Sequence, residues 1–252
     1  MTSTTADDLA AIRTQLRALA NLAISMHATR FFKSGVGEYG EGDQFLGIRV
    51  PVLRRVAREH RAVSIPVMFG LLRSPLHEER LLALLLLVAA FKRSDESGRK
   101  RIYGGYLRAI RRYVNNWDLV DTSAPDIAGQ FLEHRARAPL YELARSRNLW
   151  ERRVAILATF WFIRRNDFAD TLRIAELLLL DEHDLIHKAV GWMLREVGNR
   201  DAAAAARFLN RHHRQMPRTM LRYAIEKLSA TQRRAYLNGK RQRAGVPAAG
   251  RA

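Results

Sequence analysis

Arg153-Val154-Ala155-Ile156 opens an apolar helical run, and related segments follow at Lys188-Ala189-Val190, 35 residues later, and at Arg222-Tyr223-Ala224-Ile225, a further 34 residues on. A period in the thirties is typical of α-solenoids, in which paired helices bury their apolar faces against neighbouring repeats. Almost nothing in the sequence alternates with a period of two, so the chain is predicted to be all-α. We predict a right-handed superhelical α-solenoid of HEAT-like repeats, whose concave groove is basic because each repeat contributes a cation.

Apolar residues spaced by three and four predict helices along most of the chain. We expect one HEAT-like-repeat domain over residues 1–239 and a basic, disordered tail over 240–252. Four glycines between Ser34 and Asp43 predict a loop, which either stays flexible at the surface or orders on a ligand. The predicted helices cover residues 5–33, 51–57, 64–73, 77–91, 96–113, 117–134, 139–146, 150–165, 168–180, 184–197, 202–215, 217–228 and 230–238.

The composition indicates which kinds of molecule the protein binds. The 252 residues carry 43 Lys+Arg against 25 Asp+Glu, a net charge of +18, which attracts nucleic acid first and anionic membranes second. A merely soluble basic protein is the plainer alternative. The chain has no cysteine, which excludes disulfides and thiolate zinc sites and fits a bacterial cytoplasm or nucleoid. The apolar run 81–90 is too short to span a bilayer, so no membrane partner is expected.

No chemical motif of a metal or nucleophile site stands out. The eight histidines place no HxxxH or HExxH pair within one predicted helix, because His183, four residues before His187, precedes the predicted helix 184–197; no GxSxG or P-loop pattern is present. We therefore expect neither a metal nor a cofactor.

The segment Asn115-Asn116-Trp117-Asp118-Leu119-Val120-Asp121 is the strongest candidate for catalytic chemistry. Trp117 and Asp121 are four residues apart, so a helix places an indole and a carboxylate on one face. Pro125 cannot donate to the Asp121 carbonyl, so the helix should bend or break there. One acid beside one aromatic in a basic protein indicates a cationic substrate on an anionic polymer.

A helical wheel for residues 185–197 separates Trp192 from the apolar stripe and groups it with Lys188 and Arg195. This face either packs against a neighbouring repeat or offers nucleic acid an aromatic surface between two phosphate contacts. On the helix 150–165, Trp150 aligns with Val154 and Leu157 in a stripe predicted to be core. Arg153 lies at the edge of that stripe, where it can reach toward a groove. Arg218 and Arg222 lie four residues apart on a later helix, and Arg222 is the recurring cation of that helix.

With these residues in place, the sequence resembles the AlkD-type DNA glycosylases, the HEAT-like-repeat family of DNA alkylation repair. The similarity runs over about residues 6–240. It is strongest in FLGIRVPVLRRVARE (45–59), NNWDLVDTSAPDIAG (115–129), LWERRVAIL (149–157) and LIHKAVGWMLREVG (185–198).

The resemblance implies a monofunctional glycosylase that excises N3- or N7-alkylated purines from duplex DNA, leaves an abasic site and does not fully extrude the base. It implies that Asp121 lies beside the deoxyribose and that Trp117, Trp192 and Arg153 cradle the lesion nucleotide. Some relatives carry glutamine where this chain has Arg49. The full set of expected DNA contacts is Trp117, Trp192, Arg153, Lys188, Arg195, Arg49, Arg152, Arg218 and Arg222.

The chemistry agrees with a single carboxylate. A purine alkylated at N3 or N7 is already cationic and leaves without a general acid, unlike the usual glycoside leaving group. We therefore predict base excision by a monomer acting on double-stranded DNA that contains alkylated bases. Two alternatives are a non-catalytic DNA- or RNA-binding solenoid and a protein-binding HEAT scaffold, the second of which leaves the charge unexplained.

Overall fold

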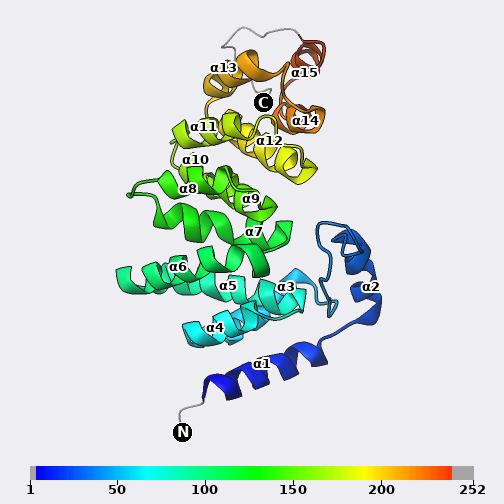
Figure 1. Cartoon of the computed structure of the whole chain (residues 1–252), viewed down its shortest axis with the longest axis vertical. Helices are drawn as coiled ribbons and strands as arrows, with labels where there is room; N and C mark the ends of the chain where they lie inside the picture. Colours follow the sequence, from blue (N-terminus) through cyan, green and yellow to red (C-terminus); the bar gives the residue numbers. More distant parts are fainter. Residues whose placement is uncertain (1–3, 240–252) are drawn as a thin grey trace, which may run out of the picture. The chain divides into compact units, whose positions relative to one another are not determined.

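The computed structural model describes residues 4–239, and this part of the chain is helical apart from its loops and one isolated bridge between Gln44 and Leu76 (Figure 1). The all-α prediction is confirmed, whereas the predicted tail 240–252 lies outside the described residues. The helices are α1 (Thr5–Ala18), α2 (Leu22–Phe31), α3 (Val50–Glu59), α4 (Ile65–Leu72), α5 (His77–Arg93), α6 (Glu96–Tyr113), α7 (Trp117–Ala124), the π-helix η1 (Pro125–Gly129), α8 (Ala138–Ala144), α9 (Leu149–Ala158), α10 (Phe160–Ile163), α11 (Ala169–Leu177), α12 (Asp184–Gly198), α13 (Ala202–His212), α14 (Arg218–Ala224) and α15 (Ala230–Leu237).

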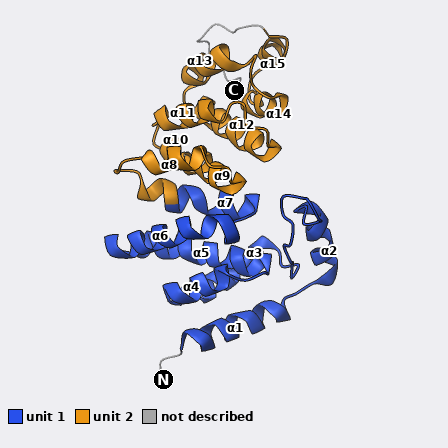
Figure 2. Cartoon of the chain, in the orientation of Figure 1, with its two compact units in different colours: residues 1–127 blue, residues 128–252 orange. Residues whose placement is uncertain are grey.

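The chain divides into two compact units, residues 1–127 and 128–252, with the division inside η1 (Figure 2). Unit 1 contains α1–α7 and unit 2 contains α8–α15. The expectation of one repeat domain over residues 1–239 stays a prediction.

Three of the predicted helices are divided. The stretch 5–33 forms α1 and α2, because the Asn21 side chain accepts from the Ile24 amide at 3.0 Å and begins a new helix. The stretch 150–165 is broken at Thr159, whose hydroxyl donates to the Ile156 carbonyl at 2.6 Å. At Pro125 the missing amide ends α7, and the chain continues as a π-helix, which confirms the predicted distortion.

In unit 1 the core forms around α5, which packs against α3, α4, α6 and α7 (Figure 1). The apolar run 81–90 supplies its centre, and Leu82, Leu84 and Leu87 are fully buried, as a core helix requires. The charged residues that precede the run, His77-Glu78-Glu79-Arg80, are buried as well. The start of α5 is therefore a polar part of the core that must find hydrogen-bond partners.

In unit 2 the core forms around α12, which packs against α9, α13 and α14. Gly191 makes the approach to α14 possible, because a Cβ at this position would lie 2.5 Å from the Met220 carbonyl oxygen. The residues two positions after each recurring cation, Ala155, Val190 and Ala224, are all buried, so the sequence period marks equivalent core positions of α9, α12 and α14. Trp150 is also buried, as its helical wheel predicts.

Gly47 offers a test of how the loop before α3 is fixed. Its φ is +79°, and an added Cβ would meet the Asn21 carbonyl oxygen at 2.1 Å. Gly37 has a similar φ of +76° but nothing within 4 Å of the added atom. We expect Gly37→Ala to lower the free energy of unfolding in urea by about 1 kcal/mol and Gly47→Ala by about 3 kcal/mol or more. Equal losses would show that the close packing at Gly47 contributes nothing.

Candidate functional site

The first turn of α7 is anchored by a buried asparagine. The Asn116 Oδ1 accepts from the Trp117 amide at 2.8 Å, while its Nδ2 donates to the Asp43 Oδ2 at 3.1 Å. Asn116 is completely buried, so both bonds lie away from water. The glycine-rich loop at 34–43 is thus joined to the start of α7 through Asp43.

His77 joins the same loop to α7. Its Nδ1 lies 3.0 Å from the Asp43 Oδ2 and its Nε2 lies 2.8 Å from the Asp118 Oδ2. Arg80 donates to the other oxygen of Asp43 at 2.6 Å. With both bases charged, the two carboxylates and two cations sum to zero, which suits a buried position.

His77, Arg80, Asp43 and Asp118 form the His77 cluster, whose charges shift the pKa values of His77 and Asp43. Burial alone would lower the pKa of His77, but the neighbouring Asp118 and Asp43 carboxylates outweigh it and raise that pKa to about 9. Burial would raise the pKa of Asp43, but the hydrogen bond from His77 and the charge of Arg80 hold it below its usual value. At neutral pH the histidine is therefore an imidazolium between two carboxylates.

A second anchor holds the last turn of α7. The Ser123 hydroxyl bonds the Leu119 carbonyl at 2.6 Å and lies 2.9 Å from the Tyr106 hydroxyl of α6. Burial raises the pKa of Tyr106, the hydrogen bond to Ser123 partly offsets this, and the negative charge of Asp121 raises it further. Tyr106 is thus a neutral phenol close enough to Asp121 to respond to its charge.

Between these anchors, α7 presents Trp117 and Asp121 one helical turn apart. Both side chains are half-buried, whereas Leu119 and Val120 are fully buried in the core. The predicted sharing of one helix face by the indole and the carboxylate follows from their spacing in an intact helix.

Two aromatic residues from the end of α2 orient the Trp117 indole. Phe32 stacks on it with ring centroids 5.4 Å apart and an interplanar angle of 25°. Phe31 meets it edge-on at 5.9 Å and 70°, and remains 56% exposed. Such offset and edge contacts each contribute about 0.5–1.5 kcal/mol beyond burial, so the indole has a defined orientation.

In unit 2, Trp192 lies half-buried on α12 with its indole fixed from two directions. Its Nε1 donates to the Glu196 Oε1 at 3.0 Å, and its ring centroid lies 5.7 Å from that of Phe160. The flanking cations also have acidic partners. Lys188 pairs with Asp184 at 2.7 Å, and Arg195 pairs with Glu196 at 3.2 Å and with Glu226.

Two predicted contacts are engaged inside unit 2. Arg153 is 4% exposed and donates from Nη1 to the Leu185 carbonyl at 2.5 Å, at the first turn of α12. The Arg153 guanidinium is therefore engaged by the first turn of α12, and its expected contact with DNA stays a prediction. Arg152 pairs with Asp181 at 2.6 Å and also donates to the Ser146 carbonyl at 3.0 Å.

The remaining predicted contacts lie at the surface. Arg49 and Arg222 are exposed, and among residues 4–239 neither has an ion-pair partner. Arg218 is exposed too, but its Nη1 donates to the Leu237 carbonyl at 3.0 Å. In this same range no group of three potential metal-ligating side chains is found, and no helix has the length and apolar character needed to cross a membrane.

Sequence reasoning missed His77, Asp43 and the phenylalanine pair that supports Trp117. The available signal was the row His77-Glu78-Glu79-Arg80 directly before the most apolar run of the chain. Charged residues in a core helix must have partners. Glu78, for example, accepts from the amides of residues 46, 47 and 48 at 2.9, 2.8 and 3.2 Å, which explains the conformation of the FLGI segment.

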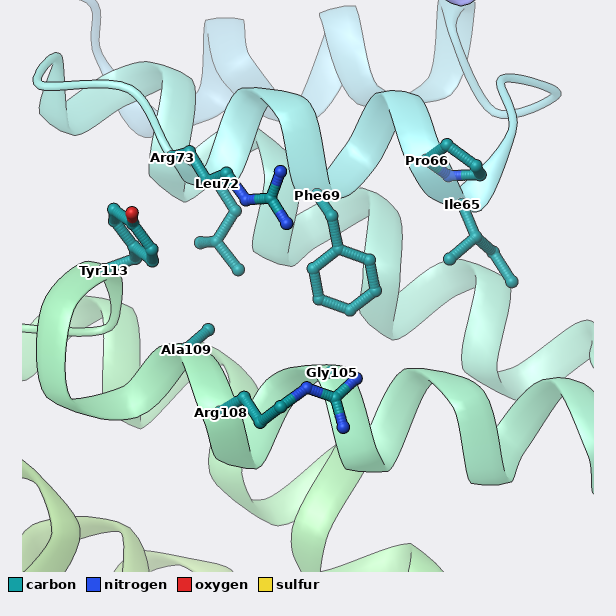
Figure 3. Close-up of a pocket in the computed structure, with 9 residues that line it drawn as sticks. All are labelled: Ile65, Pro66, Phe69, Leu72, Arg73, Gly105, Arg108, Ala109 and Tyr113. Atoms are coloured by element: carbon teal, nitrogen blue, oxygen red, sulfur yellow. The ribbon is translucent and has the colours of Figure 1, made fainter.

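A pocket of about 360 Å³ lies between α4 and α6, and none of the predicted site residues lines it (Figure 3). Phe69 points from α4 toward Gly105, where an added Cβ would approach the phenyl ring to 2.2 Å. The glycine in α6 is therefore a packing requirement.

Comparison with known proteins identifies one family. The family model described as DNA alkylation repair enzyme matches residues 12–228. Among solved structures, a predicted DNA alkylation repair enzyme from Enterococcus faecalis is similar, with a TM-score of 0.64, 15% identity, and coverage of 84% of this chain and 97% of that one. At that identity the likeness concerns the fold. Among curated proteins, no match is found.

The His77 cluster predicts a pH dependence of stability. Because the folded pKa of about 9 exceeds the ordinary value of 6.5, the stabilisation is complete below pH 6.5 and is lost as the pH rises through 9. It amounts to at most about 3 kcal/mol. Urea unfolding should show a loss of this order between pH 7 and 10 for the wild type and a smaller one for His77→Gln. The exposed His134→Gln is the control. Parallel wild-type and His77→Gln curves would contradict the prediction.

Proposed function

The chain belongs to the DNA alkylation repair enzyme family, and on that premise we propose that it is an AlkD-type monofunctional DNA glycosylase. It hydrolyses the N-glycosidic bond of positively charged N3- or N7-alkylated purines in duplex DNA, acting as a monomer in the cytoplasm. The observation that carries this proposal is the pair formed by Trp117 and Asp121, two half-buried side chains on one stripe of an anchored helix.

The reaction needs little from the protein beyond this pair. The bond from the sugar carbon to the purine breaks, its electron pair neutralises the cationic base, and water adds to the carbon while a proton goes to solvent. Positive charge develops on the sugar in the transition state, and the Asp121 carboxylate stabilises it and orients the water. Because the leaving group departs neutral, no second acid is required.

The Trp117 indole attracts the positive charge of the alkylated nucleotide. A cation against an indole face gains about 0.5–2 kcal/mol, and the gain depends on a ring that is already oriented. Phe32 and Phe31 provide that orientation in unit 1. Trp192 and Arg153 are proposed as further DNA contacts on the strength of the family resemblance. Arg152, Lys188, Arg195 and Arg218 are proposed as phosphate contacts because they are cationic.

A non-catalytic DNA- or RNA-binding protein is the alternative. It would account for the net charge of +18 equally well. It would give no reason for a carboxylate and an indole to be presented together on a helix held by buried polar anchors. Turnover therefore distinguishes the two functions.

Asp121→Asn tests the catalytic assignment. The amide keeps the size of the side chain but removes the charge, so release of methylated purines from duplex DNA should slow by about 100-fold or more. Chromatography of the released bases measures the rate, and a gel-shift assay should show unchanged binding of the duplex.

Asp126→Asn is the matched control, because Asp126 lies five residues further on, in η1, and forms a salt bridge with Lys92 at 3.4 Å. It should excise at the wild-type rate. If Asp121→Asn also keeps that rate, Asp121 is not the catalytic carboxylate.

The exposed arginines make a second prediction. Arg49→Ala and Arg222→Ala should each weaken binding to undamaged duplex DNA and reduce the slope of log affinity against log salt by about 1, since each removes one phosphate contact. Arg152→Ala should also lower the free energy of unfolding, because it leaves Asp181 without its partner at 2.6 Å. Fluorescence anisotropy at several salt concentrations and urea unfolding measure the two effects. An unchanged salt slope for Arg49→Ala and Arg222→Ala would remove both from the contact set.

A further inference from the structure

We propose that His77 is a positioning residue for base excision: by joining the carboxylates of Asp43 and Asp118, it holds Trp117 and Asp121 in their working orientation. The predicted effect on base release rests on the proposed function. Its structural part concerns unit 1 alone and can be tested without DNA.

The first step is the position of Asp118. It directly follows Trp117 and precedes Asp121 by three residues, so its attachment to His77 fixes the rotation of the first turn of α7. Its second oxygen, Oδ1, is buried and has no hydrogen-bond partner among the described residues. Asp118 therefore depends on His77, and loss of that bond would leave a carboxylate in the core poorly satisfied.

The second step concerns the proton on His77. Both ring nitrogens face carboxylate oxygens, and a neutral imidazole can donate from one of them only. We call His77 with its two carboxylate partners, Asp43 and Asp118, the clamp. Both of its hydrogen bonds can form only when the ring is an imidazolium. The groups that face it are Asp43 from the loop, Asp118 from α7 and the rings of Phe32 and Phe45, while Arg80 of α5 acts through Asp43.

The third step connects His77 to the indole. The Phe32 ring has contacts with both, since its centroid lies 4.7 Å from the His77 ring and 5.4 Å from the Trp117 ring. Movement of the imidazole is thus transmitted to Trp117 by two routes, the backbone at Asp118 and the ring of Phe32. Trp117 is an internal fluorescent reporter of the clamp.

Fluorescence of the DNA-free protein tests the clamp directly. Between pH 7 and 10 the tryptophan emission of the wild type should change with a midpoint near 9, where His77 loses its proton. The change should disappear in Trp117→Phe, which leaves Trp150, Trp161 and Trp192 as the background. It should also disappear in His77→Gln, and it should persist in the control His134→Gln.

Single-turnover release of methylated purines from duplex DNA tests the consequence for activity. His77→Gln and Asp118→Asn should slow release by about 10- to 100-fold with little change in duplex binding, because the reacting groups are displaced and not removed. The wild-type rate should fall as the pH rises through 9, and His77→Gln should lack this alkaline decline. His134→Gln should follow the wild type.

The outcomes test the positioning role of His77 and the glycosylase function separately. Wild-type release rates and an unchanged pH profile in His77→Gln would overturn the positioning role, as would an emission change that persists in that variant. If His77→Gln does not fold, Asp118→Asn decides by the same measurements. If the wild type releases no base, the glycosylase proposal fails, while the emission change still establishes or refutes the clamp.

Discussion

Unit 1 depends on the requirement that four consecutive ionisable residues at the start of α5 be paired within the core. A buried charge without a partner costs several kcal/mol, so His77, Glu78, Glu79 and Arg80 can be accommodated in few arrangements of the chain. Glu78 binds three backbone amides of the loop before α3, Glu79 pairs with Arg13 of α1 at 3.1 Å, and His77 and Arg80 bind Asp43. The elements around α5 are thereby fixed by directional bonds as well as by apolar packing.

This arrangement explains how a short helix can present its site residues reliably. The eight residues of α7 are too few to be stable alone, and a proline ends the helix at once. Asn116 and Asp118 hold its beginning, and Ser123 holds its last turn against Tyr106. Because polar contacts occupy the inner side of the helix, Trp117 and Asp121 are directed by geometry that an apolar core alone would specify less tightly.

The sequence predicts what depends on local periodicity. The helices, the distortion at Pro125, the buried Trp150 and the shared stripe of Trp117 and Asp121 all follow from spacings of a few residues. Contacts between distant segments were not predictable in this way. Asn116 and Asp43 are 73 residues apart and Arg195 and Glu226 are 31 apart, and a helical wheel contains neither pair. The bond from Arg153 to the Leu185 carbonyl of α12 was missed for the same reason, since the two residues are 32 apart.

Many arginines are paired with carboxylates inside the protein, so the net charge does not count the arginines that are available to contact phosphate. Arg80, Arg137, Arg152 and Arg195 all form ion pairs with carboxylates of the same unit. An arginine committed in this way still contributes to the long-range field that attracts DNA, but it must give up a partner to bind a phosphate closely. The field therefore reflects the whole composition, whereas close contacts are easiest for exposed residues such as Arg49 and Arg222. For a protein with this charge, attraction to DNA is general, so under the proposed function selectivity must arise where the Asp121 carboxylate and the Trp117 indole meet a cationic base.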